Sequence, residues 1–313
     1  MNLLETLTPL ELNDIIGHAN NALRTRQNPV TSAEHWLKAL NSSWYALREN
    51  LRDAHGGELG DRALFVRMLE TCLDPEDKRA LLQGVSTREF NVLTPRVMDM
   101  DSFPRATHDP ANPDSRDIER AQTAHRTFCE KYSRWTEDIR NNRGASDAVG
   151  SLARAMYAIR CNLNHCGKFP NGPDTEKVVR DRAIAGIASQ IFGHMLSLLL
   201  KRPNTRLASY GTLRPNGPNN QVLGSCQGVR SPGTIRGKIS YQDELPLFDW
   251  NISGEEVPVD VLMSAGLIEK WGELDKFEGD RYAREWVPVS LEDGSRVVAM
   301  VYVRKPSGRE TWA

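Results

Sequence analysis

The chain has 313 residues, of which 39% are apolar, and its 40 Lys and Arg nearly balance its 41 Asp and Glu. This length suggests two domains with a core each, and the composition excludes a disordered or fibrous protein. A net charge of −1 argues against general affinity for nucleic acid, although it is compatible with a local basic patch.

Five cysteines stand at irregular spacing without a CxxC pair, which favours a reduced, cytoplasmic protein. We expect no metal and no cofactor, because Cys161, His165 and Cys166 lack a second ligand pair at zinc-type spacing. The N-terminus has no basic leader followed by an apolar run, so we expect no signal peptide. The most apolar stretch, 191–200, is too short to cross a bilayer, and we expect no contact with membranes.

The first two thirds of the chain have helical patterning. Apolar residues recur at steps of three and four from Val149 to Leu163 and from Ile184 to Leu198, which indicates two bundle helices. A long exposed loop is predicted at 99–117, where Asp and Pro are frequent. Weaker patterns with start signals at Thr8-Pro9 and at 114–117 predict further helices, over 8–25, 31–54, 60–84 and 115–141.

The composition changes at 201–206, where short β-branched runs with frequent Gly and Pro begin. The predicted fold class is therefore α+β, with an all-α helical bundle at 1–202, a small mixed β-barrel at 205–305 and a tail at 306–313. One helix, 263–278, is expected between the third and fourth of the predicted strands, which are 206–210, 234–241, 256–262, 284–291 and 296–303.

Two short tracts in the barrel region suggest a reaction centre. The glycine turn Tyr210-Gly211-Thr212-Leu213-Arg214-Pro215 can aim several backbone N–H groups at one anion. The tract Leu274-Asp275-Lys276-Phe277-Glu278-Gly279 sets a carboxylate between a bulky apolar residue and a glycine, which can raise its pKa toward that of a general base. The alternative is that Gly211 only makes a turn and Glu278 only caps a solvated helix end.

With both tracts in this order, residues 205–305 resemble the gamma-glutamylcyclotransferase family. The resemblance implies that Tyr210, Gly211, Thr212 and Leu213 hold the γ-glutamyl group of a small molecule or peptide. It also implies that Glu278 is the catalytic acid/base that closes 5-oxoproline. Tyr282 and Tyr302 are candidate walls of the pocket.

A second candidate site lies in the tract from Tyr157 to Lys168. Arg160 and His165 are about 140° apart on an ideal helix, so they meet only if the helix unwinds near 162–167 or if a second copy of the chain completes the site. Residues 151–202 hold eight Lys or Arg against three acids, which favours an anion site.

This tract resembles the HEPN superfamily (higher eukaryotes and prokaryotes nucleotide-binding) of helical, usually dimeric, metal-independent ribonucleases. The resemblance implies that catalytic His165 acts on a ribose 2′-OH and that catalytic Arg160 stabilises the phosphorane. Asn162 would position this pair and Lys168 would add charge to the binding site. Asn164 and Cys166 depart from the superfamily's usual pattern. The alternative is that Arg160 and His165 only stabilise a helix end.

Our leading hypothesis from sequence is a homodimeric toxin–antitoxin or phage-defence effector that cleaves RNA, with a regulatory or catalytic barrel. The alternative is a gamma-glutamyl cyclotransferase that releases 5-oxoproline, with the helical domain as its dimerisation scaffold. A third interpretation makes both modules degenerate binding domains.

Overall fold

A computed structural model describes residues 1–52, 56–85, 115–141, 145–165, 176–224, 226–243 and 245–305. By its contacts the chain divides into two units. The helical unit comprises Met1–Leu3 and Asn21–Leu199, and the barrel unit comprises Leu4–Asn20 and Leu200–Ala313. This division places Leu4–Asn20 with the barrel, whereas the sequence analysis assigned these residues to the helical domain.

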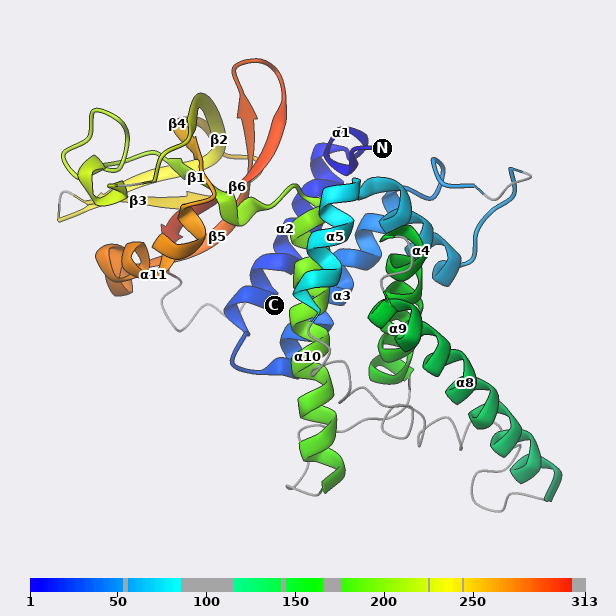
Figure 1. The fold of residues 1–313 in the computed structure, drawn as a ribbon. Helices are drawn as coiled ribbons and strands as arrows, with labels where there is room; N and C mark the ends of the chain where they lie inside the picture. The colour runs from blue at the N-terminus through cyan, green and yellow to red at the C-terminus, as the bar shows by residue number, and fades with distance from the viewer. Residues whose placement is uncertain are drawn as a thin grey trace. The chain divides into compact units, whose positions relative to one another are not determined.

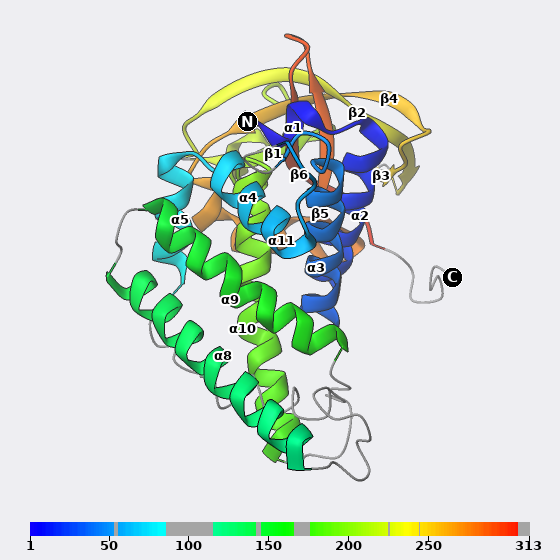
Figure 2. The same ribbon diagram turned by 90° about the vertical axis from the view of Figure 1, so that its right-hand side faces the viewer.

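In the helical unit, α10 packs against α3, and α9 packs against α4, α5 and α8 (Figures 1 and 2). The buried core includes Trp44, Phe65 and Phe192. The bounds of these helices are α3 Pro29–Ala46, α4 Asp61–Cys72, α5 Pro75–Gly84, α8 Ser115–Asn141, α9 Ala145–His165 and α10 Glu176–Leu199.

The predicted helix over 60–84 is in fact two helices, because α5 has its own start. Asp74 caps α5 by accepting a hydrogen bond from the Asp77 N–H at 2.8 Å, and Pro75 is the first helical residue. Proline suits that position because the missing N–H would have no partner there. The helix predicted over 31–54 ends at Ala46. Of the loop predicted at 99–117, residues 99–114 lie outside the described residues and 115–117 belong to α8.

The barrel unit contains one mixed sheet of six strands in the order β3-β2-β4-β1-β6-β5. A further pairing of β2 with β5 closes five of the strands into a barrel, and β3 lies outside it at the edge of β2. The predicted fold class, a helical region followed by a mixed β-barrel, is confirmed. The strands are β1 Arg206–Ser209, β2 Val229–Gln242, β3 Leu245–Trp250, β4 Glu255–Met263, β5 Tyr282–Leu291 and β6 Arg296–Arg304.

Closure of the barrel depends on a close approach of β2 to β5 at Gly233. A Cβ there would stand 2.7 Å from the carbonyl oxygen of Ser290, so only glycine fits. The interior is filled by small and β-branched side chains such as Ala208, Val259 and Val301. The sequence prediction missed β3, which contains Pro246; proline is tolerated there because β3 pairs with β2 alone.

The N-terminal segment of the barrel unit is attached to the strands β5 and β6. It contains most of α1 (Leu3–Thr6) and of α2 (Pro9–Arg24). The buried Asn20 side chain donates to the Trp286 carbonyl and accepts from the Trp286 N–H, both at 2.8 Å. The Asn20 side-chain amide thus makes with Trp286 the two hydrogen bonds that the main chain of a neighbouring strand would make. Arg296 Nη2 donates to the carbonyls of Leu4 and Leu7 at 3.0 and 2.7 Å. We call Leu4–Asn20 the N-terminal strap.

None of the helices in the described part of the chain combines the length and hydropathy that a bilayer crossing requires.

Candidate active site

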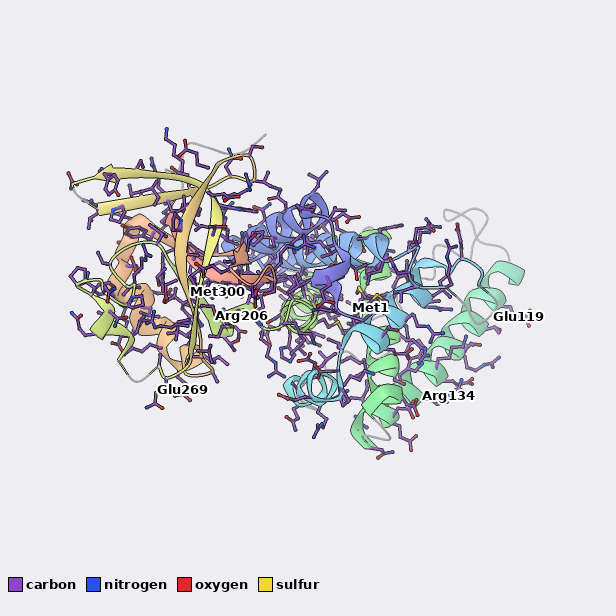
Figure 3. All side chains as sticks on the ribbon, turned by 90° about the horizontal axis from the view of Figure 1, so that it is seen from above. Met1, Glu119, Arg134, Arg206, Glu269 and Met300 are labelled. Carbon is purple, nitrogen blue, oxygen red and sulfur yellow. The ribbon has the colours of Figure 1, made fainter. Side chains whose placement is uncertain are left out.

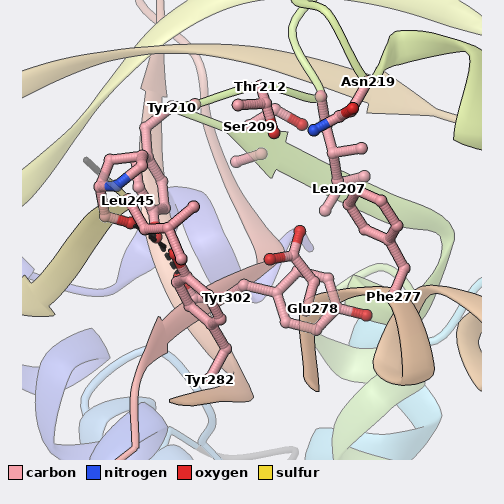
Figure 4. Close-up of a pocket in the computed structure, with 14 residues that line it drawn as sticks. Leu207, Ser209, Tyr210, Thr212, Asn219, Leu245, Phe277, Glu278, Tyr282 and Tyr302 are labelled. Atoms are coloured by element: carbon pink, nitrogen blue, oxygen red, sulfur yellow. Dashed lines mark hydrogen bonds between the residues drawn. The ribbon is translucent and has the colours of Figure 1, made fainter. Parts of the chain in front are cut away.

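A cavity of about 150 Å³ opens in the barrel unit, where the end of β1 faces the end of α11 (Leu267–Glu278) (Figure 4). It collects side chains from both tracts that the sequence analysis singled out. The lining residues are Leu207, Ala208, Ser209, Tyr210, Gly211, Thr212, Leu213, Asn219, Leu245, Pro246, Phe277, Glu278, Tyr282 and Tyr302.

The turn after β1 presents backbone N–H groups that the fold leaves unused. The N–H groups of Gly211, Thr212 and Leu213 donate to no group among the described residues, while the Thr212 carbonyl accepts from Asn219 N at 3.1 Å. Gly217 allows this tight turn, because a Cβ there would stand 2.1 Å from the Thr212 oxygen. Successive free N–H groups of this kind suit an anion.

Glu278 is the last residue of α11, and its carboxyl points into the cavity (Figure 4). Gly279 ends the helix with φ 73°, ψ −165°, a conformation open essentially to glycine alone. Burial raises the Glu278 pKa from its ordinary 4.5 to about 7. This environment differs from the solvated helix end of the alternative interpretation.

Three tyrosines wall the cavity, and each of their hydroxyls is bound to the protein. Tyr210 Oη donates to the Tyr302 carbonyl at 2.8 Å, and Tyr282 Oη donates to the Pro246 carbonyl at 2.9 Å. Tyr302 Oη donates to Asp275 Oδ1 at 2.8 Å. Desolvation raises the pKa of all three hydroxyls, so they stay protonated at neutral pH.

A network of polar contacts attaches α11 to the barrel. Asp275, one turn before Glu278, pairs with Arg284 of β5 at 3.0 Å in addition to its bond with Tyr302 of β6. The Arg284 guanidinium lies 4.3 Å from the Trp271 ring centroid, and Trp271 Nε1 donates to the Asn204 carbonyl at 2.7 Å. These contacts hold the last turn of α11, and therefore Glu278, in place.

The structure thus brings seven of the predicted site residues into one cavity: Tyr210, Gly211, Thr212, Leu213, Glu278, Tyr282 and Tyr302. Sequence reasoning missed Ser209, Asn219 and Pro246. Ser209 directly precedes the glycine turn, which was the one local signal for it. Pro246 had none, because it comes from the unpredicted β3.

The second candidate site remains untested. Helix α9 continues to His165, so the unwinding expected near 162–167 does not occur up to that residue. The Arg160 guanidinium carbon lies 5.2 Å from the Tyr157 ring centroid and 6.0 Å from that of Trp44. The side chains of Asn162 and His165, and the whole of Lys168, lie outside the described residues.

Comparison with known proteins assigns the barrel region to a family. The model of the family described as "Gamma-glutamyl cyclotransferase, AIG2-like" matches residues 207–312. The chain therefore contains a gamma-glutamyl cyclotransferase, AIG2-like domain. The N-terminal helical region has no family assignment, and the comparisons do not support the predicted ribonuclease. No curated protein matches the chain significantly.

Several solved structures are similar to this gamma-glutamyl cyclotransferase-like domain. YkqA from Bacillus subtilis is 22% identical with a TM-score of 0.28, and the match covers 32% of this chain and 36% of YkqA. An AIG2-like protein from Mus musculus is 23% identical with a TM-score of 0.26, covering 32% of this chain and 76% of that one. An uncharacterised protein from Pyrococcus horikoshii is 24% identical with a TM-score of 0.25, covering 33% and 81%. The chain thus spans about a third of the length of YkqA.

Proposed function

We propose that the barrel unit is a gamma-glutamyl cyclotransferase that releases 5-oxoproline from a γ-glutamyl amide. One observation carries the proposal: Glu278, with its pKa raised to about 7, shares a small cavity with residues 211–213, whose backbone N–H groups donate to no group in the described part of the chain. A general base works best when its pKa lies near the working pH. The N–H groups supply the complementary anion site.

The residues support a simple proton shuttle. Ionised Glu278 takes a proton from the α-amino group of the substrate, and the freed nitrogen attacks the γ-carbonyl carbon. The bond between that carbon and the departing amine nitrogen breaks, and Glu278 returns the proton to the departing amine. The products are 5-oxoproline and a free amine. Because both reacting groups belong to one molecule, the cavity contributes mainly by orienting them.

The test is incubation of the whole protein with a panel of γ-glutamyl amino acids and amines, with 5-oxoproline measured by mass spectrometry. Glu278→Gln removes the base while keeping the side-chain shape, so we expect the rate to fall by roughly 100-fold or more. Glu269→Gln, an exposed position on the same helix, is the control and keeps the wild-type rate. Absence of 5-oxoproline with every substrate, or an active Glu278→Gln variant, contradicts the proposal.

Cleavage of RNA by a homodimer of the helical unit remains a separate proposal without comparable support. It rests on the Arg160 and His165 pattern alone. Their positions are five residues apart on a continuous helix, which favours a site completed by a second copy of the chain. Expression of His165→Ala beside the wild type in bacteria tests it: equal growth and equal RNA integrity contradict a ribonuclease.

A further inference from the structure

Ser209 carries a buried hydroxyl that the fold leaves without a partner. It is the last residue of β1, it is 5% exposed, and it lines the cavity opposite Glu278. Its Oγ makes no hydrogen bond to any residue that the structure describes. Buried side-chain hydroxyls nearly always have a partner, and an unpaired one destabilises the fold. An unpaired hydroxyl in a cavity wall therefore points to a ligand.

The neighbour best placed to accept from Ser209 is engaged elsewhere. Asp260 stands opposite Ser209 in the ladder of β1 and β4, but its carboxylate forms an ion pair with Arg230. Another buried serine of the barrel unit shows the ordinary arrangement. Ser264, 6% exposed, donates to the Gln227 carbonyl at 2.6 Å and accepts from Gly266 N at 3.2 Å. Ser209 thus differs from Ser264 in that its residue lines the cavity and its buried Oγ has no partner among the described residues.

The charge of the cavity indicates what Ser209 would contact. Glu278 is the one charged residue that lines it, and no Lys, Arg or His does so among the described residues. An anionic substrate group therefore depends on neutral donors. Figure 4 shows the Glu278 carboxyl pointing toward the side of the cavity that carries Ser209 and Thr212. Because Ser209 directly precedes the turn with the free N–H groups, its hydroxyl extends that row of donors. A carboxylate can accept from several donors at once.

We propose that Ser209 contacts the substrate, and that its hydroxyl donates a hydrogen bond to the carboxylate of the γ-glutamyl group beside the N–H groups of residues 211–213. This role rests on the proposed cyclotransferase function. The carboxylate is unchanged when 5-oxoproline forms, so substrate, transition state and product all keep the contact. Such uniform binding sets KM and leaves kcat alone.

Ser209→Ala in the full chain is the test. A lost hydrogen bond to a charged group should raise KM roughly 10-fold or more, with kcat within about twofold of the wild type. The inhibition constant of 5-oxoproline should rise by the same factor as KM, because the product keeps the contact. The unfolding temperature of the ligand-free variant should stay equal or increase, since an unpaired buried hydroxyl has been removed.

Ser264→Ala is the matched control. It loses internal hydrogen bonds, so its unfolding temperature should fall while KM stays unchanged. The Ser209 proposal is overturned if Ser209→Ala keeps the wild-type KM and product inhibition, or if it loses kcat alone. A wild-type protein that neither forms 5-oxoproline nor is stabilised by it refutes the cyclotransferase function itself, and Ser209 loses its role with it. If the wild type is active and Ser209→Ala has the same KM and the same inhibition constant for 5-oxoproline, only the role of Ser209 is refuted.

Discussion

At the scale of single residues, the cavity places a carboxyl group where its charged form is disfavoured. Glu278 has no cation among the residues that line the cavity with it, and burial raises its pKa to about 7. The proton is therefore held more tightly in the folded chain than in the unfolded one. Below pH 4.5 the Glu278 carboxyl is neutral in both the folded and the unfolded chain, so its burial does not lower the free energy of unfolding. Above pH 7 it is charged in both, and the folded chain then contains a partly desolvated charge that lowers the free energy of unfolding.

We predict from this that Glu278→Gln is more stable than the wild type at pH 8.5 and equally stable at pH 4. The glutamine stays neutral, so it avoids a penalty that the wild type acquires as pH rises from 4.5 to about 7. A difference of roughly 1–3 kcal/mol is expected after allowing for partial exposure. Thermal unfolding across this pH range measures it. Glu269→Gln, at an exposed position of the same helix (Figure 3), should follow the wild-type curve throughout.

The sequence could predict several site residues because their signals are local. Gly211 and Gly279 mark turns, and Glu278 stands between Phe277 and a glycine. The structure adds the reason for Gly279, whose φ of 73° a larger residue rarely adopts. Ser209 has only its place before the glycine turn as a local signal. Its hydroxyl gains significance because it has no partner among the described residues, and that is visible only in the fold.

At the scale of elements, α11 matters because its last turn carries Glu278. That turn is attached to two strands through Asp275, which binds Tyr302 of β6 and Arg284 of β5. Helical and β periodicity predicted α11, β4, β5 and β6 to within a few residues. The same reasoning missed β3, because Pro246 and the charged Asp249 interrupt the alternation of apolar and polar residues by which a strand is recognised.

Asp275→Ala should lower kcat by roughly 10-fold and the free energy of unfolding by about 1–2 kcal/mol, because both contacts of the last α11 turn are lost. Asp275→Asn keeps an acceptor for Tyr302 and loses only the charge that faces Arg284, so it should fall between Asp275→Ala and the wild type. The rate of 5-oxoproline release and thermal unfolding provide the two measurements. A fully active Asp275→Ala variant shows that Glu278 is held by other contacts.

At the scale of the whole molecule, the barrel unit is built from both ends of the sequence. Asn20 and Trp286 exchange two hydrogen bonds across a sequence separation of 266. No local pattern in either segment predicts such a contact, so the sequence analysis assigned the strap to the helical domain. The family match begins at residue 207, so it leaves out the strap, whose Asn20 is hydrogen-bonded to β5.

Asn20→Ala should destabilise the barrel unit by about 2–4 kcal/mol, because it removes both buried hydrogen bonds between the Asn20 side chain and the Trp286 main chain. Hydrogen exchange at the amides of β5 should accelerate together with a lower unfolding temperature. Asn21→Ala, one residue further along the same helix, changes an exposed contact with Arg24 and should stay within about 0.5 kcal/mol of the wild type. If the amides of β5 exchange at the same rate in Asn20→Ala as in the wild type, the contact of the strap with β5 is not needed for the stability of that strand.

The strap also constrains how the protein is made. Leu4–Asn20 is synthesised long before β5 and β6. Until those strands exist, the strap cannot form its contacts with Trp286 and Arg296. Its side chains Leu12, Ile15 and Ile16 are buried in the finished fold. Contacts between such distant segments form slowly and expose apolar surface in the interval. The barrel unit can therefore be completed only after β5 and β6 have been synthesised, and until then the apolar side chains of the strap are a site at which the growing chain can aggregate.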